Sequence, residues 1–373
     1  MFKSYHALLG VFMSFYLFSC TSNSANVIIQ GGDYPEGAEV VQFTEIGRPS
    51  DSVKLIAEMD LLEWSKSGGT VYMEEIGDLL YFADRNSVHV FDKETLSHKT
   101  FIGGPERGQF SRIFGLFVTN DNNLLVGDAQ APHLLKSFNP NGDFLTSYPN
   151  NDPPAWFIAT DINGSFISDS LAYVTNMFAD KGTKIIKYDL RGGEANKIDN
   201  IVPVADLHAE LDSAMSSKVI TNMSVLKSRV ADSIFYVLPT NKYLINSYSM
   251  NGEKLKSIDI RGIPQINRVY SILQKLPFNS YFKSATIDDQ DNIYFHIDKL
   301  VGIEVEDTED VMDSKIANME PKVLLVSVNL WDKTYRTFQM ETRSVAPLKI
   351  IDDKLWCLDL IRSKLLLYQF PDK

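Results

Sequence analysis

Closely spaced acidic side chains form the clearest candidate for chemistry in this sequence. Asp288, Asp289 and Asp291 stand next to Asn292, so oxygen ligands recur at alternate positions, as in calcium-binding loops. The segment lacks the central glycine and the distal bidentate glutamate of an EF-hand. It also has the composition of a tight turn between two β-strands. Asp288 and Asp291 are therefore candidate calcium ligands, with a structural turn as the alternative interpretation.

Other catalytic patterns are absent from the sequence. The six histidines, at positions 6, 89, 98, 133, 208 and 296, form no HxH or HExxH pair that would indicate a zinc site. There is no Gly-x-Ser-x-Gly nucleophile motif and no GxxxxGK[ST] phosphate loop. We assign no catalytic residue and predict no cofactor, and calcium is the one metal for which a candidate site exists.

The first twenty residues have the features of an export signal. Lys3 precedes the apolar run 7–18, which is shorter than the roughly 20 residues that cross a bilayer as a helix. The run ends in Leu17-Phe18-Ser19-Cys20, which resembles the lipobox of bacterial lipoproteins and implies that Cys20 carries lipid. An ordinary secretory signal with a chance cysteine is the alternative. Several acyl chains would give stable attachment, so residues 1–19 are a predicted signal peptide and 20–38 a polar tether.

This resemblance implies that the protein is located in the cell envelope of a Gram-negative bacterium. Thr21 follows the cysteine, where an aspartate retains some lipoproteins in the inner membrane, and this favours the outer membrane. We expect contact with the membrane through the lipid anchor only. The chain has two cysteines, and Cys357 lies in a strand-like run that predicts a buried apolar role for its thiol.

Short β-type runs separated by Asn, Asp and Gly turns fill the rest of the chain. Residues 113–148 predict four successive antiparallel strands, with a turn at Asn120–Asn123 and another at Asn139–Gly142. A meander of this kind makes one blade of a β-propeller. Six such units are marked by an apolar residue before a polar turn at the end of the third strand: Phe91, Phe138, Tyr188, Tyr248, Val328 and Tyr368.

The spacing of these markers predicts an all-β, six-bladed propeller of four-stranded antiparallel blades over residues 39–373. Most intervals match the roughly 40–50 residues of a blade, and two longer ones predict insertions near 203–218 and 298–321. The first insertion has helical spacing and the second is rich in carboxylates. Because the sixth unit ends one strand short, we expect an N-terminal strand, at 40–46, to close the ring.

One segment gives this pattern a family resemblance. Ile102-Gly103-Gly104-Pro105-Glu106-Arg107-Gly108-Gln109-Phe110, leading into 113–128, resembles the inter-blade loop and repeat of NHL-type propellers. Together with the lipobox, the chain is similar to TolB-like propeller lipoproteins of bacterial envelopes. The resemblance implies a fold and a compartment, and no defined reaction. Glu106 and Arg107 interrupt the usual run of glycines.

Two functional classes remain open on this basis. With 48 acidic against 36 basic residues, the net charge of −12 argues against nucleic-acid binding. The first class is a non-catalytic, monomeric binding or scaffold protein that uses a loop face or the channel mouth for an envelope protein, peptide or glycan. The second is a metal-dependent hydrolase, lactonase or lyase with its site in the central channel, to which Asp84, Asp128 and His296 could contribute. The acidic 298–321 segment is either a site for cations or a basic partner, or a solvated loop.

Overall fold

The computed structural model describes residues 38–48, 51–61, 72–84, 86–103, 110, 113–128, 133–149, 165–179, 182–202, 223–239, 243–273, 284–300, 303–304, 307, 311–312, 315, 323–340, 345–359 and 362–371. The signal peptide, nearly all of the tether, and the helix expected at 203–218 lie outside these residues. None of the helices in the described part of the chain combines the length and the apolar character needed to cross a bilayer.

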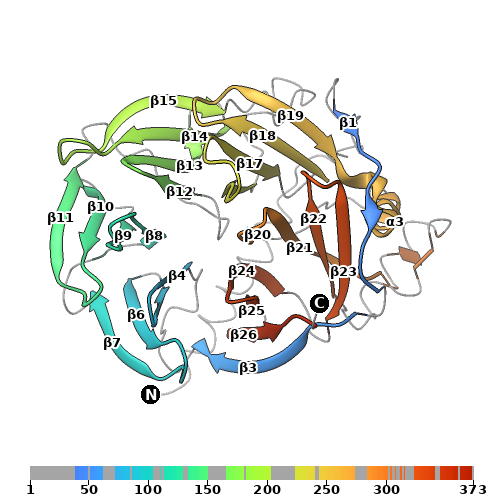
Figure 1. Ribbon diagram of the computed structural model, residues 1–373, viewed down its shortest axis with the longest axis horizontal. Helices are drawn as coiled ribbons and strands as arrows, with labels where there is room; N and C mark the ends of the chain where they lie inside the picture. Colours follow the sequence, from blue (N-terminus) through green and yellow to red (C-terminus); the bar gives the residue numbers. More distant parts are fainter. Residues whose placement is uncertain are drawn as a thin grey trace, which may run out of the picture.

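The chain folds into six antiparallel sheets arranged as a ring, which confirms the predicted propeller (Figure 1). Blades one to three contain β4 (Tyr72–Ile76), β5 (Leu79–Ala83), β6 (Ser87–Asp92) and β7 (His98–Gly103); β8 (Ile113–Val118), β9 (Leu124–Asp128), β10 (His133–Phe138) and β11 (Phe144–Pro149); and β12 (Ser165–Ser168), β13 (Leu171–Ala179), β14 (Gly182–Asp189) and β15 (Asn196–Val202). Blades four to six contain β16 (Met223–Lys227), β17 (Ile234–Pro239), β18 (Leu244–Ser249) and β19 (Lys254–Asp259); β20 (Ala285–Ile287), β21 (Asn292–Asp298), β22 (Val323–Asn329) and β23 (Thr334–Met340); and β24 (Val345–Ile351), β25 (Lys354–Asp359), β26 (Lys364–Gln369) and β3 (Lys54–Asp60).

Apolar residues on both faces of the middle strands hold the blades together. In β5, Leu80 and Phe82 pack toward blade six, whereas Tyr81 and Ala83 pack toward blade two, as the two-residue period of a strand requires. Among the described residues, one apolar cluster fills each of the six seams between blades. The six sequence markers all end third strands and are all buried.

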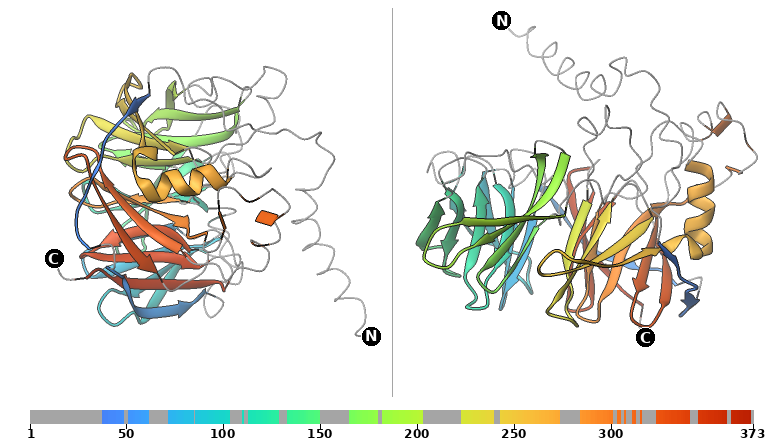
Figure 2. Two further views of the ribbon diagram at one scale, coloured as in Figure 1. Left: turned by 90° about the vertical axis from the view of Figure 1, so that its right-hand side faces the viewer. Right: turned by 90° about the horizontal axis from the view of Figure 1, so that it is seen from above.

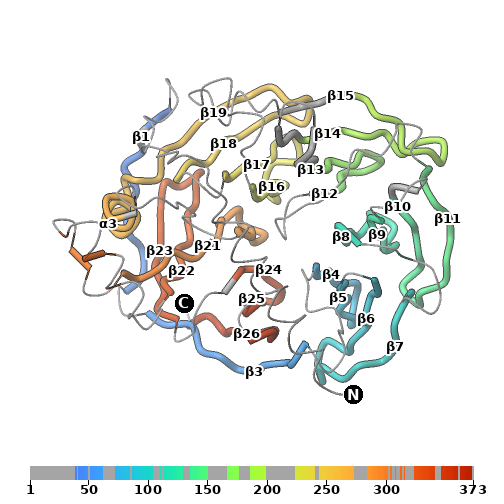
Figure 3. Tube along the Cα trace, turned by 180° about the vertical axis from the view of Figure 1, so that it is seen from behind, coloured from blue at the N-terminus to red at the C-terminus, as the bar shows by residue number. Residues whose placement is uncertain are grey.

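The innermost strands complete the ring. The first strand of each blade contacts the first strand of the next one around the whole circle, including β24 against β4. Seen from behind, β4, β8, β12, β16 and β24 lie nearest the centre and the fourth strands lie outside (Figure 3). Because each blade is a meander, its first-to-second and third-to-fourth turns lie on one side of the ring, which we call the short-turn face. Figure 2 shows the blades edge-on, with the C-terminus on one side of the ring.

An N-terminal strand does close the ring, but it is not the segment expected. The outer strand of blade six is β3, which pairs antiparallel with β26 along its whole length. The predicted closing segment at 40–46 instead overlaps two short strands, β1 (Glu39–Val40) and β2 (Thr44–Glu45), which run parallel to β19 and β23. They add a fifth strand to blades four and five. The described residues from 39 to 53 therefore form a strap along the outer edges of these two blades before the chain enters β3.

A helix missed by the sequence pattern follows blade four. The helix α3 (Pro264–Leu273) begins with proline at its first position, where no N–H is needed. Ile266, Val269 and Ile272 bury its inner face against the seam between blades four and five. The predicted insertion at 298–321 falls between the end of β21 at Asp298 and the start of β22 at Val323. Its described part is not a free acidic loop, because Leu300, Ile303 and Met312 join the same apolar cluster.

Candidate functional site: the central cavity

The centre of the ring holds a cavity of about 1380 Å³, and every blade contributes to its wall. Its lining comes mainly from the first strands and from turns of the short-turn face. The six first strands contribute Met73, Glu74, Glu75, Phe117, Val118, Phe166, Ile167, Val225, Leu226, Lys227, Thr286, Ile287, Leu348, Lys349, Ile350 and Ile351. The identity of the first-strand residues therefore decides the chemistry of the channel.

Ion pairs join blade one to blade six along this wall. Lys349 of β24 pairs with Glu74 of β4. Lys93 Nζ lies 2.8 Å from Glu75 Oε2 and 2.7 Å from Asp352 Oδ2, so one ammonium bridges two blades. Burial by itself lowers the pKa of Lys93, but the hydrogen bonds to Asp352 and Glu75 outweigh it and the net pKa is raised. These charges hold the wall in one geometry.

Asp291, a candidate calcium ligand, is a buried hydrogen-bond acceptor between blades four and five. It is the last residue of the β20–β21 turn and has a φ of 60°, a left-handed conformation that Asp and Asn tolerate better than most residues. Only 1% of its surface is exposed. Its carboxylate accepts hydrogen bonds from five donors: Ser228 Oγ, Arg229 N at 2.6 Å, Val230 N at 3.2 Å, Tyr236 Oη at 3.1 Å and Trp331 Nε1 at 2.9 Å. Burial, then the charge of Asp291, raises the pKa of Tyr236.

Asp288, the other candidate, caps the turn that contains both residues. Its Oδ1 accepts from Gln290 N and Asn292 N, both at 2.9 Å, and its Oδ2 accepts from Asn292 Nδ2 at 2.8 Å and Tyr294 Oη at 3.0 Å. The two residues do lie in a turn between strands, since β20 ends at Ile287 and β21 begins at Asn292. In the described part of the chain, no three His, Cys, Asp or Glu side chains converge in a way that could hold a metal ion.

The other residues considered for the channel lie outside its lining. Asp84 and Asp128 are buried at the second-to-third-strand side of their blades, where Asp84 Oδ1 accepts from Ser87 N at 2.8 Å and Asp128 Oδ2 pairs with Lys136 Nζ at 2.8 Å. His296 is buried within β21. Cys357 is a fully buried free thiol, and burial raises its pKa, which confirms its apolar role.

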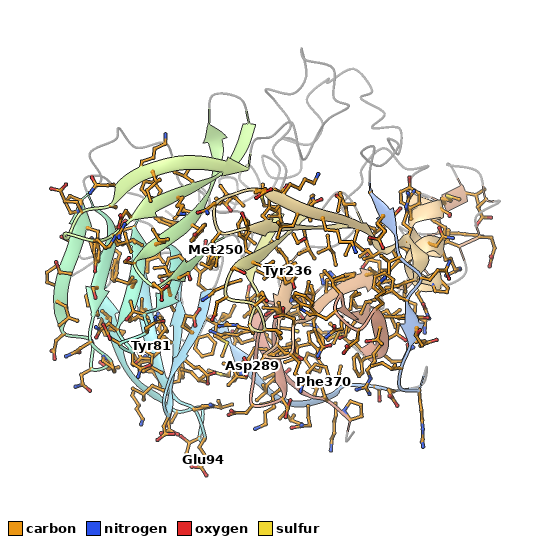
Figure 4. All side chains as sticks on the ribbon, turned by 45° about the horizontal axis from the view of Figure 1, so that its top comes forward. Tyr81, Glu94, Tyr236, Met250, Asp289 and Phe370 are labelled. Carbon is orange, nitrogen blue, oxygen red and sulfur yellow. The ribbon has the colours of Figure 1, made fainter. Side chains whose placement is uncertain are left out.

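Sequence reasoning missed the residues that give the cavity mouth its character. Trp331 lies in the β22–β23 turn, and half of its surface is exposed. Asp289, labelled near the middle of the ring in Figure 4, is exposed in the β20–β21 turn. Both residues line the cavity, together with the exposed Asp332 and Asp353. The available signal was a tryptophan in a polar turn directly after a marker residue, Val328-Asn329-Leu330-Trp331-Asp332.

Comparison with known proteins supports the fold and goes no further. No family model and no curated protein matches the chain. Among solved structures, a member of the DUF4221 family from Bacteroides vulgatus aligns with a TM-score of 0.51 at 13% identity, over 87% of this chain and 99% of that one. Virginiamycin B lyase from Staphylococcus aureus aligns with a TM-score of 0.47 at 9% identity, over 86% of this chain and all of that one.

Proposed function

We propose that this protein is a non-catalytic binding propeller of the bacterial cell envelope, anchored by lipid on Cys20, which takes a positively charged ligand into its central cavity from the short-turn face. The observation that carries the proposal is that acidic side chains outnumber basic ones in the lining of a cavity whose wall is held by ion pairs. Seven carboxylates line it (Glu74, Glu75, Asp288, Asp289, Asp332, Asp352 and Asp353), against four basic side chains (Lys227, Arg229, Arg336 and Lys349).

Four of the seven carboxylates are engaged in contacts that preorganise the wall. Glu74 and Asp352 pair with lysines across the seam between blades one and six, Glu75 pairs with Lys93 of its own blade, and Asp288 caps its own turn. Asp289, Asp332 and Asp353 are exposed, and none forms an ion pair with a described residue. Unpaired charges of one sign around a concave site attract ligands of the opposite sign and raise their rate of association.

The proposed location in the cell envelope is supported by the sequence alone. The apolar run before Cys20 and the lipobox-like Leu17-Phe18-Ser19-Cys20 support lipidation, and the resemblance to TolB-like propeller lipoproteins supports the cell envelope. Thr21 after the cysteine favours the outer membrane. Cys20→Ala should remove the lipid and release the protein from membranes. Fractionation after a high-salt wash tests this, and a variant that stays in the membrane pellet would contradict the anchor.

Neutralising the free carboxylates tests the cavity. The full chain, purified in detergent, is titrated with tetralysine by isothermal calorimetry in low salt. The double variant Asp289→Asn, Asp353→Asn should bind at least fivefold more weakly than the wild type, because two attractive charges are lost. Asp121→Asn is the matched control, since Asp121 is an exposed carboxylate in the β8–β9 turn outside the lining. Equal affinity of both variants would contradict the proposal.

The same preparation tests the metal-dependent alternative. Elemental analysis and thermal melting with calcium or zinc would show a tightly held ion as metal in the purified protein and as a raised melting temperature, because a ligand that binds the native state stabilises it. Such a result, without tetralysine binding, would favour a metal-dependent hydrolase, lactonase or lyase and overturn the binding function proposed here.

A further inference from the structure

Trp331 is held rigidly at the mouth of the cavity while its ring remains open. Its backbone N–H donates to Asn329 Oδ1 at 2.9 Å, and its indole Nε1–H donates to the buried Asp291 Oδ2 at 2.9 Å. These two bonds fix the main chain and the edge of the ring. The side chain is nevertheless 50% exposed, although a tryptophan is among the most costly residues to leave in water.

The faces of the indole ring, unlike its N–H edge, have no stacking partner among the residues that the structure describes. No aromatic ring or cationic side chain of the described residues stacks on Trp331. Val230 is 59% exposed, and its N–H donates to the carboxylate that holds the indole, so the turns of blades four and five present these two apolar side chains close together. An open aromatic face whose edge is tied to a buried carboxylate is a prepared surface for stacking.

Charge identifies what would stack there. The exposed Asp332 follows Trp331 in the same turn, and the exposed Asp289 belongs to the β20–β21 turn, which Asn329 Nδ2 ties to the β22–β23 turn through Gln290 O at 3.0 Å. Tryptophan is the best aromatic side chain for cation–π contact. A neutral sugar ring would also stack on indole, but it would gain nothing from the carboxylates, whereas a cation gains from both.

We propose that the indole of Trp331 receives a lysine or arginine side chain of a protein or peptide partner, with Asp289 and Asp332 compensating its charge. This inference rests on the proposed cavity function and deepens it by naming the partner class and the contact residue. The cation would lie over the ring face while the partner backbone crosses the short-turn face between blades four and five.

The test uses a fluorescently labelled peptide, Lys-Gly-Arg-Gly-Lys, and the full chain in detergent, with affinity read by fluorescence anisotropy. Trp331→Ala should weaken binding about tenfold, the size of a cation–π contact of 1–2 kcal/mol. Trp331→Phe keeps a weaker ring and should lose about threefold. Phe144→Ala is the matched control, because Phe144 is a comparably exposed aromatic residue on the outer strand β11, and it should bind like the wild type.

The alternative outcomes are separable. If the Asp289→Asn, Asp353→Asn variant loses peptide binding while Trp331→Ala retains it, the cavity function stands and the role of Trp331 is overturned. If a neutral oligosaccharide such as chitotetraose binds through Trp331 and the peptide does not bind, the partner class is overturned. Because Trp331→Ala and Trp331→Phe both remove the indole hydrogen bond to Asp291, each variant is first shown to melt as a folded protein. Trp331→Phe keeps an aromatic ring and supplies the comparison if the alanine variant does not fold.

Discussion

At the scale of residues, the molecule uses side chains of the short-turn face to join one blade to the next. Tyr81 Oη donates to Pro140 O at 2.7 Å, Tyr173 Oη donates to Met250 O at 3.0 Å, and Tyr236 Oη donates to Asp291. Tyr81, Tyr236 and Met250 are labelled in Figure 4. Burial raises the pKa of Tyr81 to about 12, so its hydroxyl stays a donor at any physiological pH. Asp291 is the most heavily bonded of these connections.

Asp291→Asn should lower the free energy of unfolding by about 2–4 kcal/mol. Asparagine tolerates the left-handed backbone, so the change removes the charge without imposing strain. It leaves five donors facing an amide, which cannot accept from all of them, and buried donors without acceptors cost about 1–3 kcal/mol each before relaxation. Urea unfolding measures the change. Asp289→Asn, two residues away and exposed, should change stability by less than about 0.5 kcal/mol, and equal losses in the two variants would contradict the role of Asp291.

The sequence predicted the turn around Asp291 but not its partners. Alternating apolar residues on both sides of 288–292 were sufficient to place a hairpin there. The donors Ser228 and Arg229 lie more than 60 positions earlier, and Trp331 lies 40 positions later. Only the assembled ring brings them together. An acidic turn that resembled a cation loop is thus satisfied by donors from the neighbouring blade.

At the scale of elements, the strap at 39–53 is the feature that departs most from the expected blade pattern. Glu39 pairs with Lys256 of blade four, and Asp51 pairs with Arg336 of blade five. Val41 is buried at the seam, and a Cβ on Gly262 would come within 2.3 Å of its carbonyl oxygen. The segments 40–46 and 54–60 have similar apolar content, so their sequences do not reveal which one pairs with β26. The structure shows that 54–60, and not 40–46, pairs with β26 near the other end of the chain.

Acid should loosen the strap before it unfolds the ring. The hydrogen bond from Lys256 lowers the pKa of Glu39, and the backbone N–H of Arg48, with Arg336, lowers that of Asp51. A carboxylate with a lowered folded-state pKa stabilises the fold above its ordinary value, here 4.5 and 3.8, and this contribution disappears as the pH falls through the lower folded-state value. We therefore expect faster hydrogen exchange in residues 39–53 below about pH 4.5.

Mass spectrometry over pH 3 to 7, corrected for intrinsic exchange rates, measures this effect. The variant Glu39→Gln, Asp51→Asn should exchange rapidly in the strap at neutral pH and lose most of the pH dependence there. Peptides from β13 and β14 of blade three, away from the strap, provide the internal reference. A strap that stays protected from exchange at pH 3 would contradict the prediction. It would show that apolar and backbone contacts hold the strap in place without the two ion pairs.

At the scale of the whole molecule, the number of blades and the order of their strands could be predicted, because each blade repeats the same sequence pattern of buried strands and polar turns. The residues that line the cavity could not be predicted from the sequence. Their identity depends on which strand of each blade is innermost, and the second strands, which carry the clearest apolar signal, pack between blades instead of facing the channel. The first strands face the channel, and some of them, such as Ala285–Ile287, are too short to carry a clear pattern.

Removal of the closing strand should be far more damaging than removal of the strap. Deleting 39–47 takes away β1, β2 and Val41 but leaves β3 on β26, so we expect a monomer destabilised by about 1.5–3 kcal/mol, the burial of one apolar side chain. Deleting 21–60 removes β3 and exposes the whole hydrogen-bonding edge of β26, an open edge that invites pairing with other chains. Light scattering after size exclusion should then show aggregates. We attribute this to the open edge and not to lost apolar burial, because Leu55 and Ile56 of β3 are over 40% exposed in the intact protein. A 21–60 deletion that stays monomeric and melts like the strap deletion would mean that three strands suffice in blade six. The seam between blades six and one, with its Lys349–Glu74 and Lys93–Asp352 pairs, would then close the ring by itself.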